Sequence, residues 1–331
     1  MIEIRGLRKN FGEKRALDGL SLTVREGVAF GLLGRNGAGK TTTIRILMNI
    51  FREDAGEVLI DGVPAWKEPK RIGYLPEERG LYPKRTILEQ MTYLAKLKGI
   101  EPKRAEQVAK DKLAEMDATE YTNSKLDTLS KGNQQKIQLA VALLGDPEIV
   151  ILDEPFSGLD PINAQILKDA VRRQVDLGKT VIFSSHQMAQ VEEFCDDIVI
   201  IDRGRAVIEG NLADIKKSYP RNKVLITAEG DAAALKAALD AQPYVKEAVP
   251  KGDGFAVTLA DAGQRTPLLR TLDESGVPLD GFSVLEPTLE QIFIEKAGEP
   301  DPADADAGAA DAAPEAAGKK RRGLFGRRAK P

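Results

Sequence analysis

The stretch that decides the fold is Gly34-Arg35-Asn36-Gly37-Ala38-Gly39-Lys40-Thr41, which matches the pattern G-x-x-x-x-G-K-[ST]. It follows an apolar run at 28–33 that is typical of a buried strand, and it precedes helical apolar content at 44–50. Glycines let the backbone wrap a phosphate so that successive N–H groups point inward, and the helix N-terminus adds its positive dipole end. The pattern predicts a phosphate-binding loop, residues 34–41, between a strand and a helix.

Individual positions of this phosphate loop have expected roles. Lys40 is expected to reach the β- and γ-phosphates of a nucleotide, and the Thr41 hydroxyl to ligate Mg²⁺. Thr42 is expected to touch the α-phosphate. The further residues expected to bind the nucleotide here are Gly34, Asn36, Gly37, Ala38 and Gly39. The alternative is a chance match in a glycine-rich turn, which the flanking strand and helix disfavour.

Polar residues follow two other apolar runs. Residues 149–152 are wholly apolar, as in a strand buried on both faces, and Asp153 and Glu154 come next. In phosphate-loop enzymes an Asp at this place holds Mg²⁺, and Glu154 is expected to be the general base that polarises the attacking water. His186 follows the predicted strand 180–184, and we expect it beside the γ-phosphate. The alternatives are ordinary surface acids and a structural histidine.

Length and composition exclude several classes of protein. The chain has 331 residues, which suggests about two domains, and 42% of them are apolar and 30% charged, as in globular proteins. A net charge of −3 gives no electrostatic reason to expect nucleic-acid binding. The single cysteine and single histidine exclude an intramolecular disulfide and a multi-histidine metal site.

The sequence shows neither a membrane span nor a signal peptide. The longest stretch free of acidic and basic residues is 180–191, which is too short to cross a bilayer. The N-terminus has no apolar segment of the kind that signal peptides carry. We therefore expect a cytoplasmic protein, with any membrane role exercised through a partner.

The order of predicted elements indicates an α/β core at 1–215. Within it, residues 86–145 have a 3.6-residue apolar period and a Thr-x-x-Glu capping box, so they are expected to form a helical subdomain. Residues 216–297 restart as strand–helix–strand–strand–helix–strand, which suggests a small ferredoxin-like α+β domain. Residues 298–331 are rich in Ala, Asp and Pro and then basic, and are expected to be disordered. Their basic end, 319–330, is either solvated or attached to anionic lipid.

Over roughly residues 1–215 these motifs resemble the ATP-binding subunit of ATP-binding-cassette (ABC) transporters. The most distinctive match is Leu129-Ser130-Lys131-Gly132-Asn133-Gln134-Gln135, which resembles the signature motif of that family. The resemblance implies that Ser130 and Gly132 contact the γ-phosphate bound by the opposite subunit. A simple Ser N-cap is the alternative, and one geometry can serve both uses.

Further positions resemble the family in chain order. Phe11 resembles the aromatic residue that stacks on adenine, a core Phe being the alternative. Residues 157–160 resemble the loop that communicates across the dimer, and His186 resembles the switch histidine. Glu77 stands where the family usually has a glutamine, in a loop that touches Mg²⁺ and the attacking water. Its carboxylate suits Mg²⁺ but, when ionised, cannot donate a hydrogen bond. Lys131 and Asn133 also depart from the commoner Gly and Gln.

The resemblance implies a P-loop NTPase with an ABC-type core that hydrolyses ATP with Mg²⁺. Its catalytic residues would be Glu154, His186 and Lys40, and its metal ligands Thr41, Asp153 and Glu77. Two copies, or one copy and a sister ATPase chain, would sandwich two ATP molecules at their interface. A separate transmembrane permease would dock on the helical subdomain, placing the chain peripherally on the inner face of the cell membrane.

The class of transporter is suggested by the loop at 75–83 together with the signature motif. Both are similar to those of a bacterial subgroup that includes sodium-efflux and drug-resistance exporters, which implies export. The alternative is a soluble ABC-type ATPase that acts on ribosomes or DNA. The single phosphate loop and the absence of sustained heptads between it and the signature disfavour that alternative.

Overall fold

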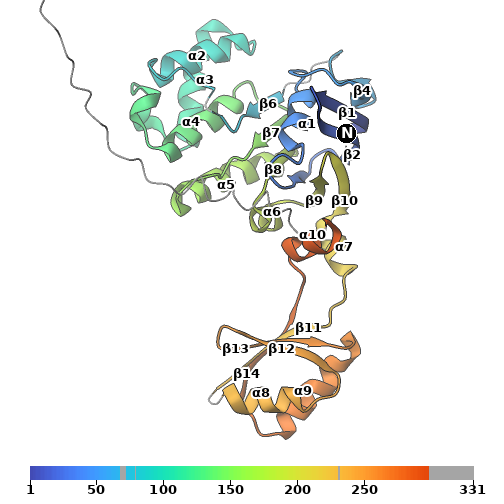
Figure 1. The fold of residues 1–331 in the computed structure, drawn as a ribbon. Helices are drawn as coiled ribbons and strands as arrows, with labels where there is room; N and C mark the ends of the chain where they lie inside the picture. The colour runs from blue at the N-terminus through green and yellow to red at the C-terminus, as the bar shows by residue number, and fades with distance from the viewer. Residues whose placement is uncertain (68–71, 79, 230–231, 298–331) are drawn as a thin grey trace, which may run out of the picture.

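The computed structural model describes residues 1–67, 72–78, 80–229 and 232–297. Figure 1 shows a larger part with two sheets and a smaller part with its own sheet, joined by two connecting segments. The expected disordered tail at 298–331, with its basic end, lies outside the described residues. Within the described ranges, no helix is both long enough and apolar enough to cross a membrane.

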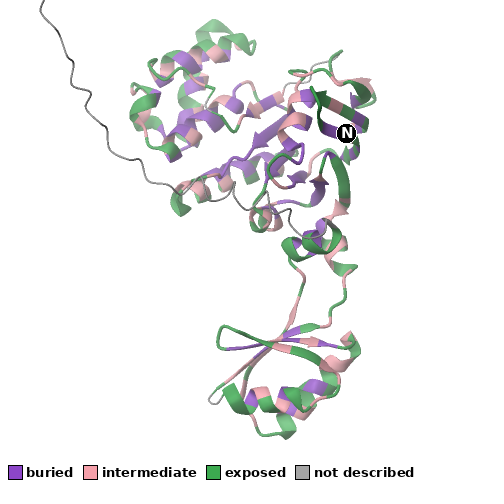
Figure 2. Cartoon of the chain, viewed as in Figure 1, coloured by how far each residue is buried: buried purple, intermediate pink, exposed green. Residues whose placement is uncertain are grey.

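The central sheet of the larger part has the strand order β10-β9-β3-β8-β7-β6. All neighbours in it are parallel except the edge pair β9 and β10. The strands are β3 (Ala29–Leu33), β6 (Ile72–Leu75), β7 (Ile149–Asp153), β8 (Thr180–Ser185), β9 (Asp197–Asp202) and β10 (Arg205–Asn211). The middle strands β3, β7 and β8 are buried throughout, as their apolar runs predicted (Figure 2). Their carboxyl ends meet at one edge, where parallel α/β sheets place ligands.

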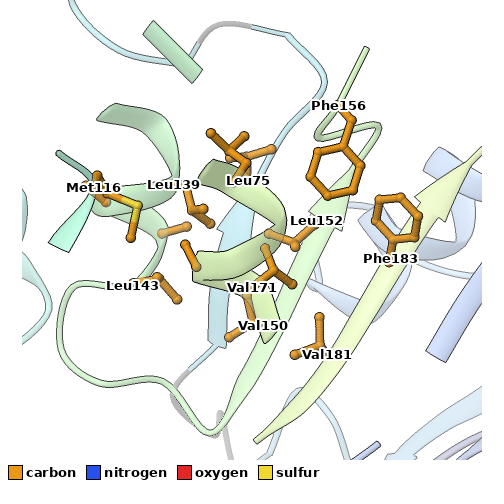
Figure 3. Packing of buried hydrophobic residues seen from close by; sticks show 14 of the residues in the cluster. Leu75, Met116, Leu139, Leu143, Val150, Leu152, Phe156, Val171, Val181 and Phe183 are labelled. Carbon is orange, nitrogen blue, oxygen red and sulfur yellow. The ribbon is translucent and has the colours of Figure 1, made fainter. Parts of the chain in front are cut away.

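Alternate side chains of β7 enter the two apolar clusters on opposite faces of this sheet. Val150 and Leu152 belong to one cluster, and Ile149 and Ile151 to the other. Figure 3 shows the first cluster, where the phenyl rings of Phe156 and Phe183 lie 5.2 Å apart between their centroids. Because both faces of β7 are packed, the residues that follow the strand are held on a rigid support.

A second, antiparallel sheet has the order β2-β1-β4-β5. Its strands are β1 (Ile2–Phe11), β2 (Lys14–Val24), β4 (Ala55–Ile60) and β5 (Val63–Pro64). In the sequence, apolar runs indicate a strand only at 2–5 and 20–24 within these first two strands. The remainder is mostly polar and exposed, and it forms by pairing of the strands with one another, down to Phe11 opposite Lys14. This extended hairpin carries Phe11 at its tip.

Most helices of the larger part lie where helix caps and apolar periods in the sequence indicate them. They are α1 (Lys40–Leu47), α2 (Ile87–Leu97), α3 (Pro102–Glu115), α4 (Lys131–Ala142), α5 (Pro161–Asp176), α6 (Met188–Phe194) and α7 (Leu212–Lys217). The predicted capping box of Thr86 and Glu89 is present, and Asp160, which stands before Pro161 in the sequence, caps α5. The short helices α6 and α7 were not predicted, because seven and six residues carry too little periodicity.

The smaller part contains β11 (Lys223–Ala228), α8 (Ala232–Asp240), β12 (Val245–Lys251), β13 (Gly254–Leu259), α9 (Arg265–Glu274) and β14 (Leu279–Leu285). Its antiparallel sheet has the order β12-β13-β11-β14, the ferredoxin-like arrangement expected from the element order. An apolar cluster of its own, which includes Val224, Leu235 and Leu268, forms the core of this part.

The last described helix, α10 (Leu289–Ala297), departs from the expectation that placed it in the small domain. Figure 1 shows it beside α7, away from the small sheet. Its Leu289, Ile292 and Phe293 belong to the core cluster of the larger part. An amphipathic pattern predicts that a helix buries one face, but it does not say against which neighbour.

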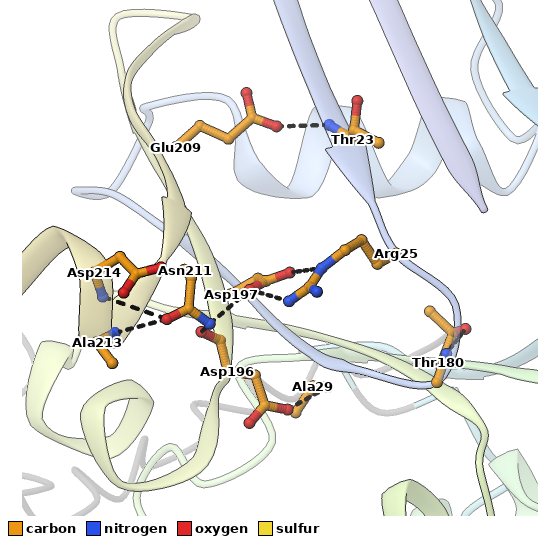
Figure 4. A network of polar contacts seen from close by, with 11 residues as sticks. Thr23, Arg25, Ala29, Thr180, Asp196, Asp197, Glu209, Asn211, Ala213 and Asp214 are labelled. Carbon is orange, nitrogen blue, oxygen red and sulfur yellow. Dashed lines mark hydrogen bonds and ion pairs between the residues drawn. The ribbon is translucent and has the colours of Figure 1, made fainter.

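A network of hydrogen bonds and an ion pair joins Arg25, which follows β2, to Asp197 and Asn211 near the end of the larger part (Figure 4). The Arg25 guanidinium donates to both carboxylate oxygens of Asp197, at 2.6 and 2.7 Å. The Asn211 side-chain amide donates to Asp197 and, through its oxygen, caps α7. This fork-shaped pair joins the residue after β2 to the start of β9.

Replacing Asp197 by Asn should lower the free energy of unfolding at neutral pH by about 1–3 kcal/mol, because the charge-assisted pair with Arg25 is lost. The hydrogen bonds from Arg25 lower the pKa of Asp197 below its ordinary value of 3.8. The stabilisation is therefore complete above that value and disappears as pH falls through the lower, folded-state pKa. Urea unfolding of both proteins at pH 7 and in acid measures this difference.

The matched control is Asp214→Asn, which changes an exposed carboxylate whose ammonium partner, Lys217, lies 3.4 Å away. It should leave the unfolding midpoint nearly unchanged. An equally small effect of Asp197→Asn would show that the two-pronged pair of Arg25 with the buried Asp197 carboxylate contributes no more than a fully exposed pair.

Candidate active site

The phosphate loop connects β3 to α1 and has a backbone that requires glycine at two positions. Gly39 has φ +117°, and a Cβ there would lie 2.7 Å from the Leu17 side chain and 2.9 Å from the Ala16 carbonyl oxygen. Gly34 has φ +155°, and a Cβ there would lie 2.4 Å from the Ile201 carbonyl oxygen. The loop is thus pressed against β2 and β9, directly before the N-terminus of α1.

Lys40 extends its buried side chain into this loop. Its ammonium donates to the Gly34 carbonyl at 2.7 Å and to the Arg35 carbonyl at 3.4 Å. It also lies 3.6 Å from Oε1 of Glu154. Burial lowers the pKa of Lys40, while the Glu154 and Asp153 carboxylates oppose that shift. The result is a buried cation surrounded by oxygen atoms at the floor of the loop.

Asp153, at the end of β7, has one satisfied and one unsatisfied carboxylate oxygen. Oδ1 accepts a hydrogen bond from Ser184 at 2.5 Å and another from Thr41 at 3.5 Å. Oδ2 is buried and has no hydrogen-bond partner among the described residues. Burial raises the pKa of Asp153, and the two hydroxyl donors oppose the shift. A buried, unpartnered carboxylate oxygen beside a hydroxyl is a good donor set for a hard cation.

The oxygen atoms of Asp153 and Thr41 fit a Mg²⁺ ion that the protein shares with the phosphate groups of a substrate. The described residues contain no group of three or more acidic, His or Cys side chains that could hold a metal by itself. Mg²⁺ is commonly held by one or two protein ligands together with water and substrate phosphates. Asp153 and Thr41 therefore fit a cation that arrives with a nucleotide.

Glu154 adopts a left-handed backbone conformation, with φ +50°, that is unusual for a side-chain-bearing residue. Its N–H donates to the carbonyl and to the hydroxyl oxygen of Ser184, at 3.2 and 3.1 Å. The carboxylate Oε1 lies 2.9 Å from Nδ1 of His186. Contacts on both sides thus orient the buried carboxylate, with His186 toward solvent and Lys40 toward the loop.

A cavity of about 350 Å³ opens over the phosphate loop, a volume of the size that small-ligand sites have. It is lined by Phe11, Lys14, Ala16, Asn36, Gly37, Gly39, Lys40, Thr41, Thr42, Glu77 and Glu154. Nine of these were candidate site residues, and Lys14 and Ala16 are additions. We call this cavity the cleft.

For two residues that line the cleft, Phe11 and Glu77, the sequence left open how they meet a ligand. The Phe11 side chain is 45% exposed and meets the Phe51 ring edge-on, with 5.4 Å between centroids, so it is not a core residue. The pKa of Glu77 is raised, first by partial burial and then by the nearby carboxylates of Asp153 and Glu154. Both side chains are placed to meet a ligand in the cleft.

Ser130 and Gly132 lie apart from the other candidate residues. Ser130 caps α4 by accepting a hydrogen bond from the Asn133 N–H, as its alternative role required. A Cβ on Gly132 would lie 2.5 Å from the Asn163 side chain of α5. Neither residue lines the cleft.

Sequence reasoning missed Ser184, which bonds to both Asp153 and Glu154. Because β7 and β8 are parallel neighbours, Asp153 pairs with Ser184 in the sheet register. A serine at the end of the next predicted strand was the available signal, since parallel strands bring their carboxyl ends together.

Comparisons with known proteins agree with this geometry. Residues 17–157 match a family described as "ABC transporter", and residues 210–297 match "ATP-binding protein DrrA1-3-like, C-terminal domain". YhaQ of Bacillus subtilis (strain 168), called an uncharacterized ABC transporter ATP-binding protein, is 41% identical over 90% of this chain and 99% of its own length. The linearmycin resistance ATP-binding protein LnrL of the same strain is 30% identical over 90% of this chain and 98% of its own.

A solved structure is also similar. The ATP-binding cassette MJ0796, in a dimeric post-hydrolysis state bound to ADP and Pi, superposes with a TM-score of 0.59 and 25% identity. The match covers 64% of this chain and 99% of that chain.

Proposed function

Because this chain belongs to the family of ABC transporter ATP-binding proteins, we propose that it is one half of a dimer that hydrolyses ATP to drive a separate membrane-spanning permease. The chain is an ATPase of that family with ATP as its nucleotide. The single observation that carries the proposal is the Glu154 carboxylate, oriented between the Lys40 ammonium and the His186 imidazole.

In the proposed mechanism, each of these side chains has one task. Glu154 accepts a proton from the water that attacks the γ-phosphorus, and His186 holds the carboxylate in place and lies next to the γ-phosphate. Lys40 offsets the negative charge that the phosphate oxygens carry in the transition state. Phe11, at the tip of the hairpin, stacks on the adenine ring.

Mg²⁺ would be held by Thr41 and Asp153, with Glu77 close to it. The buried, unpartnered Oδ2 of Asp153 supports this assignment. The metal ion would neutralise charge on the β- and γ-phosphate oxygens. Because a Glu77 carboxylate replaces an amide, its task is to attract the cation rather than to donate a hydrogen bond to the water.

The dimer is supported by the place of the signature motif. Ser130 and Gly132 lie outside the cleft of their own chain, so they would complete the cleft of a second chain. A helix N-terminus such as that of α4 is suited to a phosphate group. Each of the two enclosed ATP molecules would then contact both chains, and hydrolysis would let the dimer open. The second chain would be an identical copy or a sister ATPase.

The permease is proposed to dock on the helical subdomain formed by α2, α3 and α4, which would place the chain on the inner face of the cell membrane. Export is the proposed direction, supported by the relative LnrL, whose name refers to linearmycin resistance. We propose residues 1–215 as the ATPase domain, with the helical subdomain at about 86–145, and residues 216–297 as an accessory domain.

The test is to isolate the chain from its native membranes in mild detergent, measure ATP hydrolysis, and identify what co-purifies. We expect a stoichiometric protein with several membrane spans. As a control, the same preparation washed with high salt should retain that protein but lose ribosomes and nucleic acid. Recovery with ribosomes or DNA alone, or without any partner, would overturn the transporter role and favour the soluble alternative.

A further inference from the structure

Helix α10 attaches the C-terminal side of the small domain to the larger part. Its Leu289 and Ile292 are fully buried and Phe293 is 3% exposed. They pack against α6 and β10, in the same cluster as the central sheet. Because α7 precedes the small domain and α10 follows it, the domain is anchored to the larger part at both of its ends.

The Phe293 ring reaches the phosphate loop. The guanidinium carbon of Arg35 lies 5.1 Å from the centroid of the ring, within the range of a cation–π contact. Arg35 is the second residue of the loop, and its carbonyl accepts from the Ala38 N–H at 3.1 Å and from the Lys40 ammonium at 3.4 Å. The ring therefore restrains the residue whose backbone orients Lys40.

The first residue of α10 is bonded to the other side of the site. The Leu289 N–H donates to the Glu192 carboxylate of α6, which also lies 3.5 Å from the Lys216 ammonium of α7. Helix α6 begins two residues after His186. One helix thus contacts both the phosphate loop and the element that follows the histidine.

The two segments that connect the small domain are themselves joined. Arg221, before β11, forms an ion pair with Glu286, after β14. A displacement of the small domain would therefore act on both segments together, and the outgoing one leads within three residues into α10. This gives the small domain a direct physical route to the phosphate loop.

We propose that Phe293 is a positioning residue for the phosphate loop, through which the small domain sets the affinity of the cleft for ATP. The proposal rests on the assignment of the cleft as the nucleotide site. Removing the ring takes away one of the contacts that hold Arg35, so part of the cost of ordering the loop falls on ATP, which then binds more weakly. The contacts that orient Glu154 are unchanged, so turnover at saturating ATP is preserved.

The test compares Phe293→Leu, which keeps an apolar side chain but removes the ring, with Phe293→Tyr, which keeps the ring. For Phe293→Leu we expect KM for ATP to rise about three- to tenfold, with kcat near the wild-type value. Phe293→Tyr should restore KM. Trp66→Leu removes another cation–π pair, with Lys67 at 5.2 Å from the ring, far from the cleft lining, and should change neither constant.

Arg35→Ala and the double variant that combines it with Phe293→Leu complete a double-mutant cycle for this contact. We expect the double variant to bind ATP no more weakly than the weaker of the two single variants, because Arg35→Ala and Phe293→Leu both remove the same cation–π contact. The positioning role is overturned if the KM changes of the two single variants multiply in the double variant, or if KM is unchanged in Phe293→Leu. Either result leaves the assignment of the cleft intact, because the wild-type chain still hydrolyses ATP. A wild-type chain that fails to bind ATP would instead overturn the site assignment and this proposal with it.

Discussion

Replacing Glu154 by Gln is expected to lower the rate of ATP hydrolysis by about a hundredfold to ten-thousandfold, the range that a general base contributes. Glutamine has nearly the same shape but cannot accept the proton of the attacking water. The backbone N–H of residue 154 donates to the carbonyl and the hydroxyl oxygen of Ser184, and these hydrogen bonds do not involve the side chain that is replaced. ATP affinity should therefore stay close to that of the wild type.

Single-turnover hydrolysis and equilibrium ATP binding separate these two effects, and gel filtration with ATP reports the oligomeric state. We expect the variant to bind ATP and to accumulate as a dimer, because ATP that joins two chains is not consumed. The matched control is Glu106→Gln on α3, where an exposed carboxylate pairs with Lys110 at 2.6 Å, away from the cleft lining. Wild-type turnover in Glu154→Gln would remove Glu154 as the base.

Most of the fold could be predicted because its signals are local. The apolar runs of β3, β7 and β8 and the caps at Thr86 and Asp160 lie where the sequence places them. What could not be predicted depends on partners distant in the chain. The hairpin tip at Phe11 forms by strand pairing without an apolar pattern, and α10 buries its face against α6, nearly a hundred residues earlier.

The candidate site divides in the same way. Residue types and spacing were sufficient to propose Lys40, Asp153 and Glu154, because phosphate loops and acidic strand ends are strong patterns. Contacts between elements could not be predicted from the sequence. The hydrogen bonds of Ser184 depend on the register of β7 against β8, and the Arg35–Phe293 contact depends on how α10 packs. A pattern identifies the chemistry of a side chain, whereas its neighbours depend on the tertiary fold.

Replacing Lys40 by Met is expected to weaken ATP binding by about a hundredfold, since charge-assisted hydrogen bonds to phosphate contribute about 1.5–3 kcal/mol each. Methionine keeps much of the length and apolar stem of lysine but carries no charge. The buried ammonium of Lys40 lies 3.6 Å from Glu154 and donates to the Gly34 carbonyl of the loop, so triphosphate binding would lose a counter-charge held inside the loop. Turnover would fall as well, because the same charge acts on the transition state.

Equilibrium binding of ATP without hydrolysis tests this directly, since Lys40→Met should fail at the binding step whereas Glu154→Gln fails only at the chemical step. Lys110→Met on α3 is the matched control, because its ammonium is exposed and pairs with Glu106 outside the cleft lining. Thermal unfolding confirms that the variant is folded. If Lys40→Met bound ATP as tightly as the control, the contacts of Lys40 with Gly34 and Glu154 would be structural, and the phosphate-binding role would fall to the loop N–H groups alone.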